Sequence, residues 1–247
     1  MKDMFSKQSA EYQLFRPIYP SSWYEAWMHL VQNRTMAWDC ATGNGQTARD
    51  LLPFFPSIAA TDISDQQLKK AFADPRIHYS VASAEHNDFP DKYFDLVTVS
   101  QAAHWFDLQA FYAELERTIR PGGLLAIWGY HLPRFGDQID EVVNEFYEGT
   151  LGSSWDEARK HIDSYYSDLY FPYTDLKLPI FQMEMSFSLD QLIGYLSTWS
   201  ALQTYRKTTG TDPLPQVAAD LKAVWPNQEI LIGKFPIFSK FALFPAK

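Results

Sequence analysis

The sequence predicts an α/β fold built on a doubly wound, Rossmann-like sheet. Three observations support this prediction. Segments typical of strands and helices alternate through the first half of the chain, as they do in βαβ units. Residues 35–40 form a candidate strand that runs through a glycine-containing turn, 41–45, into a candidate helix. Residues 93–100 are almost continuously apolar, which is typical of a strand covered on both faces.

The strands of the first half are predicted from runs of apolar and β-branched residues, and the helices from their first and last turns. The strands cover residues 35–40, 57–62, 76–81, 93–100 and 124–128. Pro53 and Pro56 end a helix over 46–52. Ser64 opens a capping box, S-x-x-Q, for a helix that reaches about residue 72. Asp107 caps a third helix, whose apolar positions recur at helical spacing: Leu108, Phe111, Leu115 and Ile119.

After Tyr130 the alternation is lost. The remaining elements are predicted as helices over 137–149 and 154–168, a strand over 180–187, a helix after the Ser188 capping box, a helix over 216–224, and one or two closing strands within 229–244. No shift in composition marks a boundary, so the chain is predicted to be a single domain, 1–247. Residues 131–228 are then a cap built onto the same sheet.

Composition and charge exclude several classes of protein. The net charge of −9 disfavours a nucleic-acid partner, because the field of the whole chain repels phosphates. The single cysteine, Cys40, excludes an intrachain disulfide and a multi-cysteine zinc site. The N-terminus has no apolar signal-peptide core, and no window approaches the roughly 20 apolar residues that a membrane helix needs. The sequence therefore predicts a cytoplasmic protein without a membrane partner.

The turn after the first strand carries the clearest functional signal. Gly43 and Gly45 allow the backbone to turn tightly and to approach a ligand closely, and the helix that follows presents free backbone N–H groups. Asp62 ends the next strand, seventeen residues beyond Gly45, where a carboxylate can accept hydrogen bonds from both hydroxyls of a ribose. A second acid, Asp39, stands four residues before Gly43.

Two classes of nucleotide-binding protein share this arrangement. Residues 43–48 satisfy the dinucleotide pattern G-x-G-x-x-G/A, with Asp62 as the acid that follows it. The turn alone therefore does not separate a nicotinamide cofactor from S-adenosylmethionine. Asp39 favours S-adenosylmethionine, because an acid beside the turn repels a pyrophosphate but attracts the amino group of a methionine-derived ligand, directly or through water.

The sequence resembles the class I S-adenosylmethionine-dependent methyltransferases, and more narrowly the type 11 small-molecule branch that includes trans-aconitate methyltransferase-like proteins. Besides the glycine turn, five stretches spread over most of the chain carry the resemblance: 12–20 (YQLFRPIYP), 83–85 (SAE), 94–106 (from FDLV to QAAHWF), 120–123 (RPGG) and 195–201 (YLSTWSA). The chain departs from the family's D-x-G-x-G-x-G pattern at Ala41, and alanine is a mild departure there as long as φ is negative.

The resemblance implies a fold, an activity and a set of site residues. The fold is a seven-stranded sheet whose last strand is antiparallel, with a helical cap inserted after strand five. The activity is methyl transfer from S-adenosylmethionine, with S-adenosylhomocysteine as the product, and residues 1–22 cover the cofactor. The implied cofactor-binding residues are Arg16, Tyr19, Asp39, Ala41, Thr42, Gly43, Gly45, Asp62, Ile63, Ala84, Glu85, Gln101 and Ala102.

Within this set the resemblance assigns a part of the cofactor to each group of residues. The glycine turn faces the methionine moiety, Asp62 holds the ribose, 84–85 lie near the adenine, and 101–102 lie near the sulfonium. Arg16 is placed to pair with the cofactor carboxylate, since the guanidinium fork matches a carboxylate.

His104 is the candidate catalytic residue. It lies in the loop after the fourth strand, and a histidine titrates near neutrality, as a general base should. Methyl transfer depends mainly on positioning the reactants and excluding water, however, and a base is optional. We therefore expect His104 first to shape the loop and only second to act as a base.

The acceptor is expected to be a small molecule in an aromatic pocket. Aromatic residues make up 16% of the chain, more than a core alone usually uses. The candidate acceptor-binding residues are Trp105, Trp128, His131, Trp199 and Tyr205. The histidines lack metal-ligand spacing, so no metal is expected. Two other functions stay open: an NAD(P)-dependent oxidoreductase, and a non-catalytic S-adenosylmethionine-binding protein. The oligomeric state is also open.

Overall fold

The computed structural model describes residues 15–226 and 230–246. Within these ranges seven strands form one mixed sheet in the order β3-β2-β1-β4-β5-β7-β6. The strands are β1 (Ala37–Cys40), β2 (Ile58–Asp62), β3 (Ile77–Val81), β4 (Phe94–Ser100), β5 (Ile119–Tyr130), β6 (Phe181–Phe187) and β7 (Leu231–Leu243). The first five pair in parallel, and β7 runs antiparallel to both of its neighbours, β5 and β6. The predicted seven-stranded sheet with an antiparallel last strand is confirmed.

The strand order reverses at the centre of the sheet. β1 pairs with β2 on one side and with β4 on the other, and the chain winds outward in both directions from this point. In open α/β sheets, ligands bind at the carboxyl ends of the strands beside such a reversal. A ligand site is therefore expected at the carboxyl ends of β1 and β4.

Alternate residues of the central strands enter two separate cores, one on each face of the sheet. On β5, Leu124, Ala126 and Trp128 pack into one core, and Leu125 and Ile127 into the other. Helix α2 (Ser21–Met28) packs into the first core and helix α5 (Leu108–Thr118) into the second. This period-two division explains why the strands are apolar at successive positions.

Short helices follow the first two strands. α3 (Gln46–Asp50) starts directly after the glycine turn. α4 (Asp65–Leu68) is capped by Ser64, whose hydroxyl accepts from the backbone N–H of Gln67. Asp107 caps α5 by accepting from the N–H of Ala110, so the two caps predicted in the first half of the chain are present.

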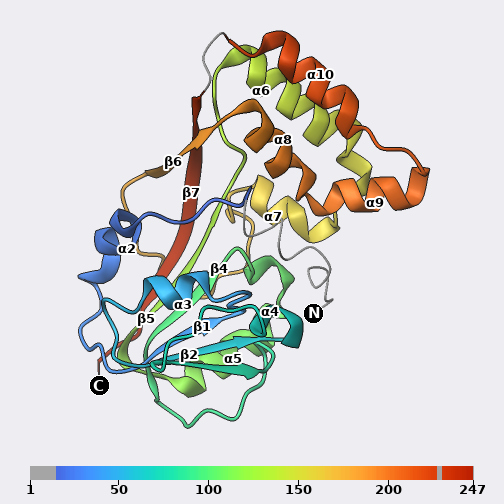
Figure 1. Ribbon diagram of the computed structural model, residues 1–247. Coiled ribbons are helices and arrows are strands. Elements are labelled where there is room, and N and C mark those ends of the chain that lie inside the picture. Colours follow the sequence, from blue (N-terminus) through green and yellow to red (C-terminus); the bar gives the residue numbers. More distant parts are fainter. Residues whose placement is uncertain (1–14, 227–229, 247) are drawn as a thin grey trace.

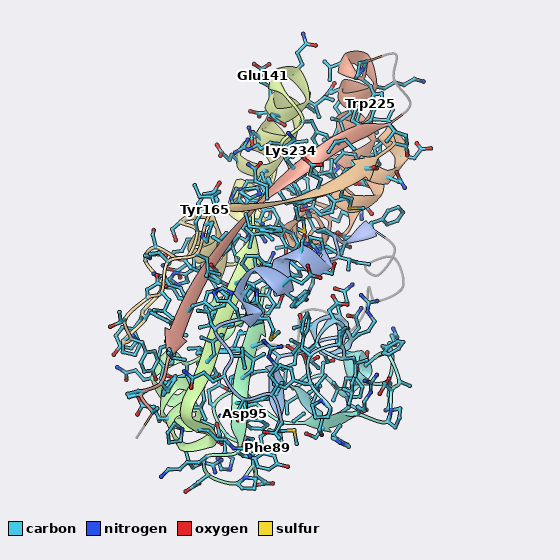
Figure 2. The ribbon with its side chains drawn as sticks, turned by 90° about the vertical axis from the view of Figure 1, so that its left-hand side faces the viewer. Phe89, Asp95, Glu141, Tyr165, Trp225 and Lys234 are labelled. Atoms are coloured by element: carbon cyan, nitrogen blue, oxygen red, sulfur yellow. The ribbon has the colours of Figure 1, made fainter. Side chains whose placement is uncertain are left out.

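The cap is a group of helices at one end of the molecule. Figure 1 shows α6 (Asp137–Asn144), α8 (Leu189–Ser197), α9 (Ser200–Thr209) and α10 (Leu214–Val224) gathered there, with β5 and β7 extending toward them. In Figure 2, Glu141 and Trp225 mark this end, and Asp95 and Phe89 mark the opposite end. None of the helices in the described ranges combines the length and the apolar character that a bilayer crossing requires.

The structure corrects several predicted elements. The helix predicted over 154–168 is wrong: only a short 3-10 turn, η4 (Glu157–Arg159), and one helical turn, α7 (Lys160–Asp163), form there. Tyr165 and Tyr166 then take left-handed φ values of 55° and 57°, which no right-handed helix accommodates. The helix predicted over 137–149 is α6 followed by a π-helical turn, η2 (Glu145–Thr150). The closing segment is one long strand, β7, and the start of its predicted range, residue 229, lies outside the described residues.

Candidate active site

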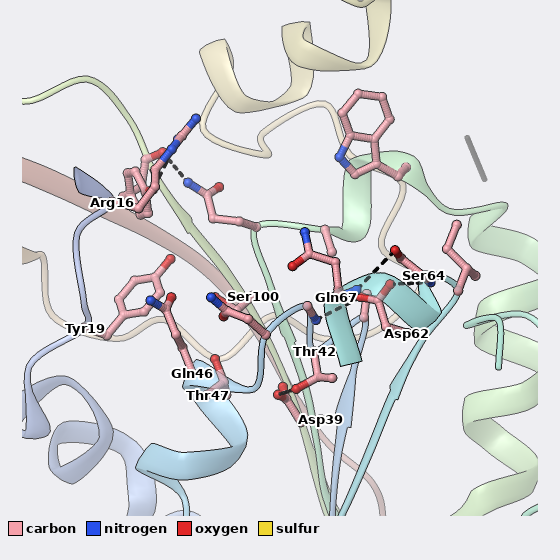
Figure 3. Close-up of a pocket in the computed structure, with 18 of the residues that line it drawn as sticks. Arg16, Tyr19, Asp39, Thr42, Gln46, Thr47, Asp62, Ser64, Gln67 and Ser100 are labelled. Carbon is pink, nitrogen blue, oxygen red and sulfur yellow. Dashed lines mark hydrogen bonds between the residues drawn. The ribbon is translucent and has the colours of Figure 1, made fainter. Parts of the chain in front are cut away.

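A cavity opens at the carboxyl ends of β1, β2 and β4 (Figure 3). The empty space within it is about 1050 Å³, the open solvent at its mouth included. Its walls come from four parts of the chain: 16–19 before α2, the turn and first residues of α3 from 41 to 47, the residues after β2 from 62 to 67, and the loop after β4 from 100 to 105. Asp39 and Tyr130 complete the lining.

The glycine turn is held by backbone hydrogen bonds and by a close approach to β3. The N–H of Thr42 donates to the carbonyl of Thr61, joining the turn to β2. Gly45 caps α3 with a φ of 81°, and a Cβ built on it would lie 2.2 Å from the hydroxyl of Tyr79. Its left-handed φ and this close approach both favour glycine at position 45. Gly45 does not line the cavity, whereas Gly43 does.

Two residues that are not glycine take left-handed backbone conformations beside the cavity. Ala41 follows β1 with a φ of 56°, and Gln101 follows β4 with a φ of 54°. The expectation that Ala41 is a mild departure is thus corrected, because the position needs a positive φ that alanine disfavours. Both residues line the cavity, so the strain is concentrated at the site, as it is in many functional sites.

Replacing Ala41 by glycine is expected to stabilise the protein by up to about 1 kcal/mol, because glycine adopts this φ without a Cβ clash. Ala219→Gly is the matched control: Ala219 is exposed on α10, and there the same substitution is expected to cost about 1 kcal/mol. Urea unfolding of the three proteins measures both changes. Equal destabilisation at both positions would contradict the strained conformation at Ala41.

Asp62 fixes the turn with its side chain. One carboxylate oxygen accepts from the N–H of Gly43 and the other from the N–H of Ser64, both at 2.8 Å (Figure 3). Each oxygen can accept a second hydrogen bond. The carboxylate lies on the cavity wall, so it can also receive hydroxyls of a ligand.

Asp39 lies at the floor of the cavity and is only 1% exposed. The hydroxyls of Thr42 and Thr98 donate to its two oxygens. Burial raises the pKa of Asp39 to about 7, and these hydrogen bonds reduce that rise without cancelling it. A cation in the cavity would therefore favour the ionised carboxylate.

Arg16 and Tyr19 cover the cavity from the segment before α2. The Arg16 guanidinium donates to the hydroxyl of Tyr130, at 3.4 Å, and to the carbonyl of Thr198, at 3.3 Å. It also lies 5.5 Å from the ring centroid of Tyr195 in the cap. Arg16 thus joins the end of β5 to the end of α8.

A second cavity, of about 520 Å³ with the open solvent at its mouth included, adjoins the first. The two share Arg16, Gln101, Trp105 and Tyr130. The remaining lining of the second cavity consists of His104, Trp155, Asp156, Arg159 and Ser200. Ligands in the two cavities would therefore meet along one shared wall.

Comparisons with known proteins now identify the family. A family model described as a methyltransferase domain matches residues 38–127. A Dictyostelium discoideum protein named as a candidate methyltransferase is 32% identical over 244 residues, which is 96% of this chain and 93% of that one. The solved structure of a candidate type II methyltransferase from Anaeromyxobacter dehalogenans is 37% identical, with a TM-score of 0.87 over 94% of this chain and 100% of that one.

The chain belongs to the class I S-adenosylmethionine-dependent methyltransferases. A Saccharomyces cerevisiae protein named as a probable S-adenosylmethionine-dependent methyltransferase is also similar, at 26% identity over 69% of this chain and 61% of that one. The nicotinamide alternative finds no support among these relatives.

The structure of this methyltransferase brings most of the expected cofactor residues together. The cavity is lined by Arg16, Tyr19, Asp39, Ala41, Thr42, Gly43, Asp62, Ile63, Gln101 and Ala102. Ala84 and Glu85 do not line it. Ala84 is buried in the core that contains α5, and Glu85 accepts a hydrogen bond from the N–H of Asp107.

His104 lies in the second cavity of the methyltransferase and contacts Tyr166. Its Nδ1 is 2.9 Å from the Tyr166 hydroxyl. Burial is the main cause that lowers the pKa of His104 to about 3, and the electrostatic effects of Arg159 and His161 contribute to the same shift. The imidazole is therefore neutral at physiological pH and a weak base.

Of the five candidate acceptor residues, only Trp105 lines the cavities. Trp128 is fully buried against Trp23 and Trp27, because its side chain leaves β5 on the face that α2 covers. Trp199 stacks on Phe146 inside the cap. The other two also lie outside both cavities: His131, whose Nε2 is 3.2 Å from a carboxylate oxygen of Asp163, and Tyr205, which packs against the cap core.

Several residues that line the cavities carry no local signal in the sequence. Trp155, Asp156, Arg159 and Ser200 come from the irregular segment before α7 and from the start of α9. Tyr130 ends β5, two residues beyond Trp128 on the same face of the sheet. The alternation of β5 could have pointed to it. The residues of the cap could not be found, because their placement depends on how the cap folds onto the sheet.

Proposed function

We propose that this methyltransferase transfers a methyl group from S-adenosylmethionine to a small-molecule acceptor. The observation that carries the proposal is the pair of adjoining cavities with a shared wall at Gln101 and Trp105. One cavity has the size and the acids for the cofactor, and the other is smaller and partly aromatic. Such a division places two ligands in contact and excludes water from between them.

The residues of the larger cavity fit S-adenosylmethionine. The Oε1 of Gln101 is buried and accepts no hydrogen bond from the described residues, while its Nε2 is fixed by the carbonyl of Tyr130 at 3.0 Å. A ligand donor would satisfy that oxygen. Asp62 would hold the ribose hydroxyls, Asp39 the ammonium group and Arg16 the carboxylate. When bound, the cofactor would supply a methyl group on a positively charged sulfur, which leaves as a neutral thioether.

The protein's own contribution is positioning. The backbone around Gln101 is fixed by a hydrogen bond from its N–H to the carbonyl of Trp128, and the His104 ring lies against Trp105, with 4.8 Å between ring centroids. With a pKa of about 3, His104 orients the shared wall and does not remove a proton from the acceptor. A proton released by a neutral acceptor goes to solvent.

Cofactor affinity is expected to depend on pH through Asp39. Its pKa is about 7 in the free protein, and an ammonium group bound beside it would lower that pKa. Below pH 7, binding must therefore release about one proton, and affinity should fall as the pH falls; above pH 7 it should level off. Titration calorimetry with S-adenosylhomocysteine from pH 5.5 to 8, in buffers of different ionisation enthalpy, measures both effects.

Asp39→Asn is the control for this pH dependence. The amide keeps hydrogen-bonding capacity but cannot ionise, so the variant should bind more weakly at pH 8 and show a nearly flat profile. A profile in the variant as steep as that of the wild type would assign the proton to another group.

The proposed function itself is tested in two steps. Calorimetric titration with S-adenosylhomocysteine, NAD and NADP should show binding of the first alone. Incubation with methyl-labelled S-adenosylmethionine and a mixture of small metabolites should then yield a labelled low-molecular-weight product. If S-adenosylhomocysteine binds but no acceptor of any kind is labelled, the non-catalytic alternative replaces the proposal.

A further inference from the structure

Arg159 is held rigidly in the second cavity and does not reach the first. Its guanidinium carbon lies 4.8 Å from the ring centroid of Trp155 and 5.5 Å from that of Tyr147. Its Nε donates to the Tyr147 hydroxyl at 2.9 Å, and that hydroxyl donates to a carboxylate oxygen of Asp163. Two rings and a hydrogen-bonded relay thus fix the direction of the side chain.

The charge of Arg159 is not neutralised by direct contact. In the part of the chain that the structure describes, no carboxylate forms an ion pair with it, and no hydrogen bond involves its terminal nitrogens. Asp163 is separated from it by the Tyr147 hydroxyl. Asp156 lines the same cavity, but one of its oxygens caps the turn that carries Arg159 by accepting from the N–H of Ala158. Arg206, by contrast, forms a direct ion pair with Asp212 at 2.8 Å.

The neighbouring titratable groups respond to this positive charge. Burial is the main cause of the low pKa of His104, and the charge of Arg159 is the next. Arg159 also opposes the rise that burial produces in the pKa of Tyr166, the partner of His104. Although the chain carries a net charge of −9, the lining of the second cavity contains Arg16 and Arg159 against Asp156, so this cavity attracts anions.

We infer that Arg159 anchors a carboxylate of the methyl acceptor, so that the acceptor is a small organic acid with an apolar body. The inference rests on the proposed function. A guanidinium offers two parallel N–H donors that match a carboxylate, and Trp105 and Trp155 provide ring surface for the body of the ligand.

The anchored carboxylate is not the atom that receives the methyl group. Arg159 lines the second cavity and not the first, while the wall shared with the cofactor cavity is formed by Gln101, Trp105 and their neighbours. Pairing with a guanidinium also withdraws electron density from a carboxylate and weakens it as a nucleophile. The reacting atom therefore lies at the other end of the acceptor, near Gln101.

Ligand binding to the protein saturated with S-adenosylhomocysteine tests the inference. The probes are phenylacetate and phenylacetamide, which have the same shape and differ by one charge. The wild type should bind the acid at least about tenfold more tightly than the amide. In Arg159→Gln the ratio should fall below about twofold, whereas Arg206→Gln, the same substitution outside both cavities, should keep the wild-type ratio.

Each outcome decides between the two proposals. Failure of the wild type to bind S-adenosylhomocysteine would remove the proposed function. If the wild type binds S-adenosylhomocysteine but binds phenylacetate and phenylacetamide equally tightly, the role of Arg159 is overturned and the proposed function is left intact. The same conclusion follows if it binds S-adenosylhomocysteine but neither probe. A wild-type preference for the acid that survives in Arg159→Gln would also overturn that role, and the wild-type comparison stands even if the variant fails to fold.

Discussion

Asp62→Ala is expected to weaken S-adenosylhomocysteine binding by at least about a hundredfold, which corresponds to about 2.7 kcal/mol. The variant removes the carboxylate proposed to accept the ribose hydroxyls, and hydrogen bonds to a charged group contribute about 1.5–3 kcal/mol each. It also releases the N–H groups of Gly43 and Ser64, so the turn that faces the ligand loses its fixed geometry. Titration calorimetry measures the loss.

Asp65→Ala is the matched control for Asp62→Ala. Asp65 is exposed at the start of α4, three residues further on, and its carboxylate pairs only with Lys69 among the described residues. Binding by this variant should stay within about twofold of the wild type, since an exposed ion pair contributes little. If Asp62→Ala binds as tightly as Asp65→Ala, the ribose does not reach Asp62 and the cofactor lies elsewhere in the cavity.

Asp95→Ala is expected to lower the free energy of unfolding by about 3–5 kcal/mol. The carboxylate is 3% exposed and accepts hydrogen bonds from the backbone N–H groups of Thr35 and Met36, from the Thr35 hydroxyl and from Arg120. It thereby joins the start of β4 to the start of β1 and to the R-P-G-G segment. Without it, the donors stay at this site and lose their acceptor. Urea unfolding at pH 7 measures the change.

The destabilisation by Asp95→Ala should shrink in acid. Burial alone would raise the pKa of Asp95, but the hydrogen bonds from Thr35 and Arg120 hold it below the ordinary value of 3.8. The unfolded state therefore binds the proton first, and the stability that Asp95 contributes is lost as the pH falls through its folded pKa. Asp91→Ala is the control. The Asp91 side chain is 73% exposed and pairs with Arg117, so its removal should lower the free energy of unfolding by less than about 1 kcal/mol. A loss of similar size in both variants would contradict the account.

The parts of the site that could be predicted from sequence are those fixed by local chain geometry. The glycine turn and Asp62 follow strands of a parallel sheet, so spacing alone brings them to one edge. The φ of Ala41 was not predictable, because the alanine itself argues for the opposite sign. Trp128 was predicted to end its strand, but β5 continues to Tyr130, and the Trp128 side chain points into the core under α2.

The cap explains why the residues of the second cavity could not be predicted from the sequence. Arg159 belongs to a 3-10 turn without periodic apolar residues, and it reaches the cavity because Trp155 and Tyr147 hold it there. Contacts between segments that are distant in sequence decide such a site, and a pattern read along the chain does not contain them.

The position of Arg16 has a consequence for the order of events in a catalytic cycle. The same side chain covers the larger cavity, walls the smaller one, and holds the cap end of α8 to the end of β5. A displacement of the Arg16 side chain would therefore change the walls of both cavities together. A ligand that moves Arg16 in one cavity would therefore also alter the surroundings of a ligand in the other.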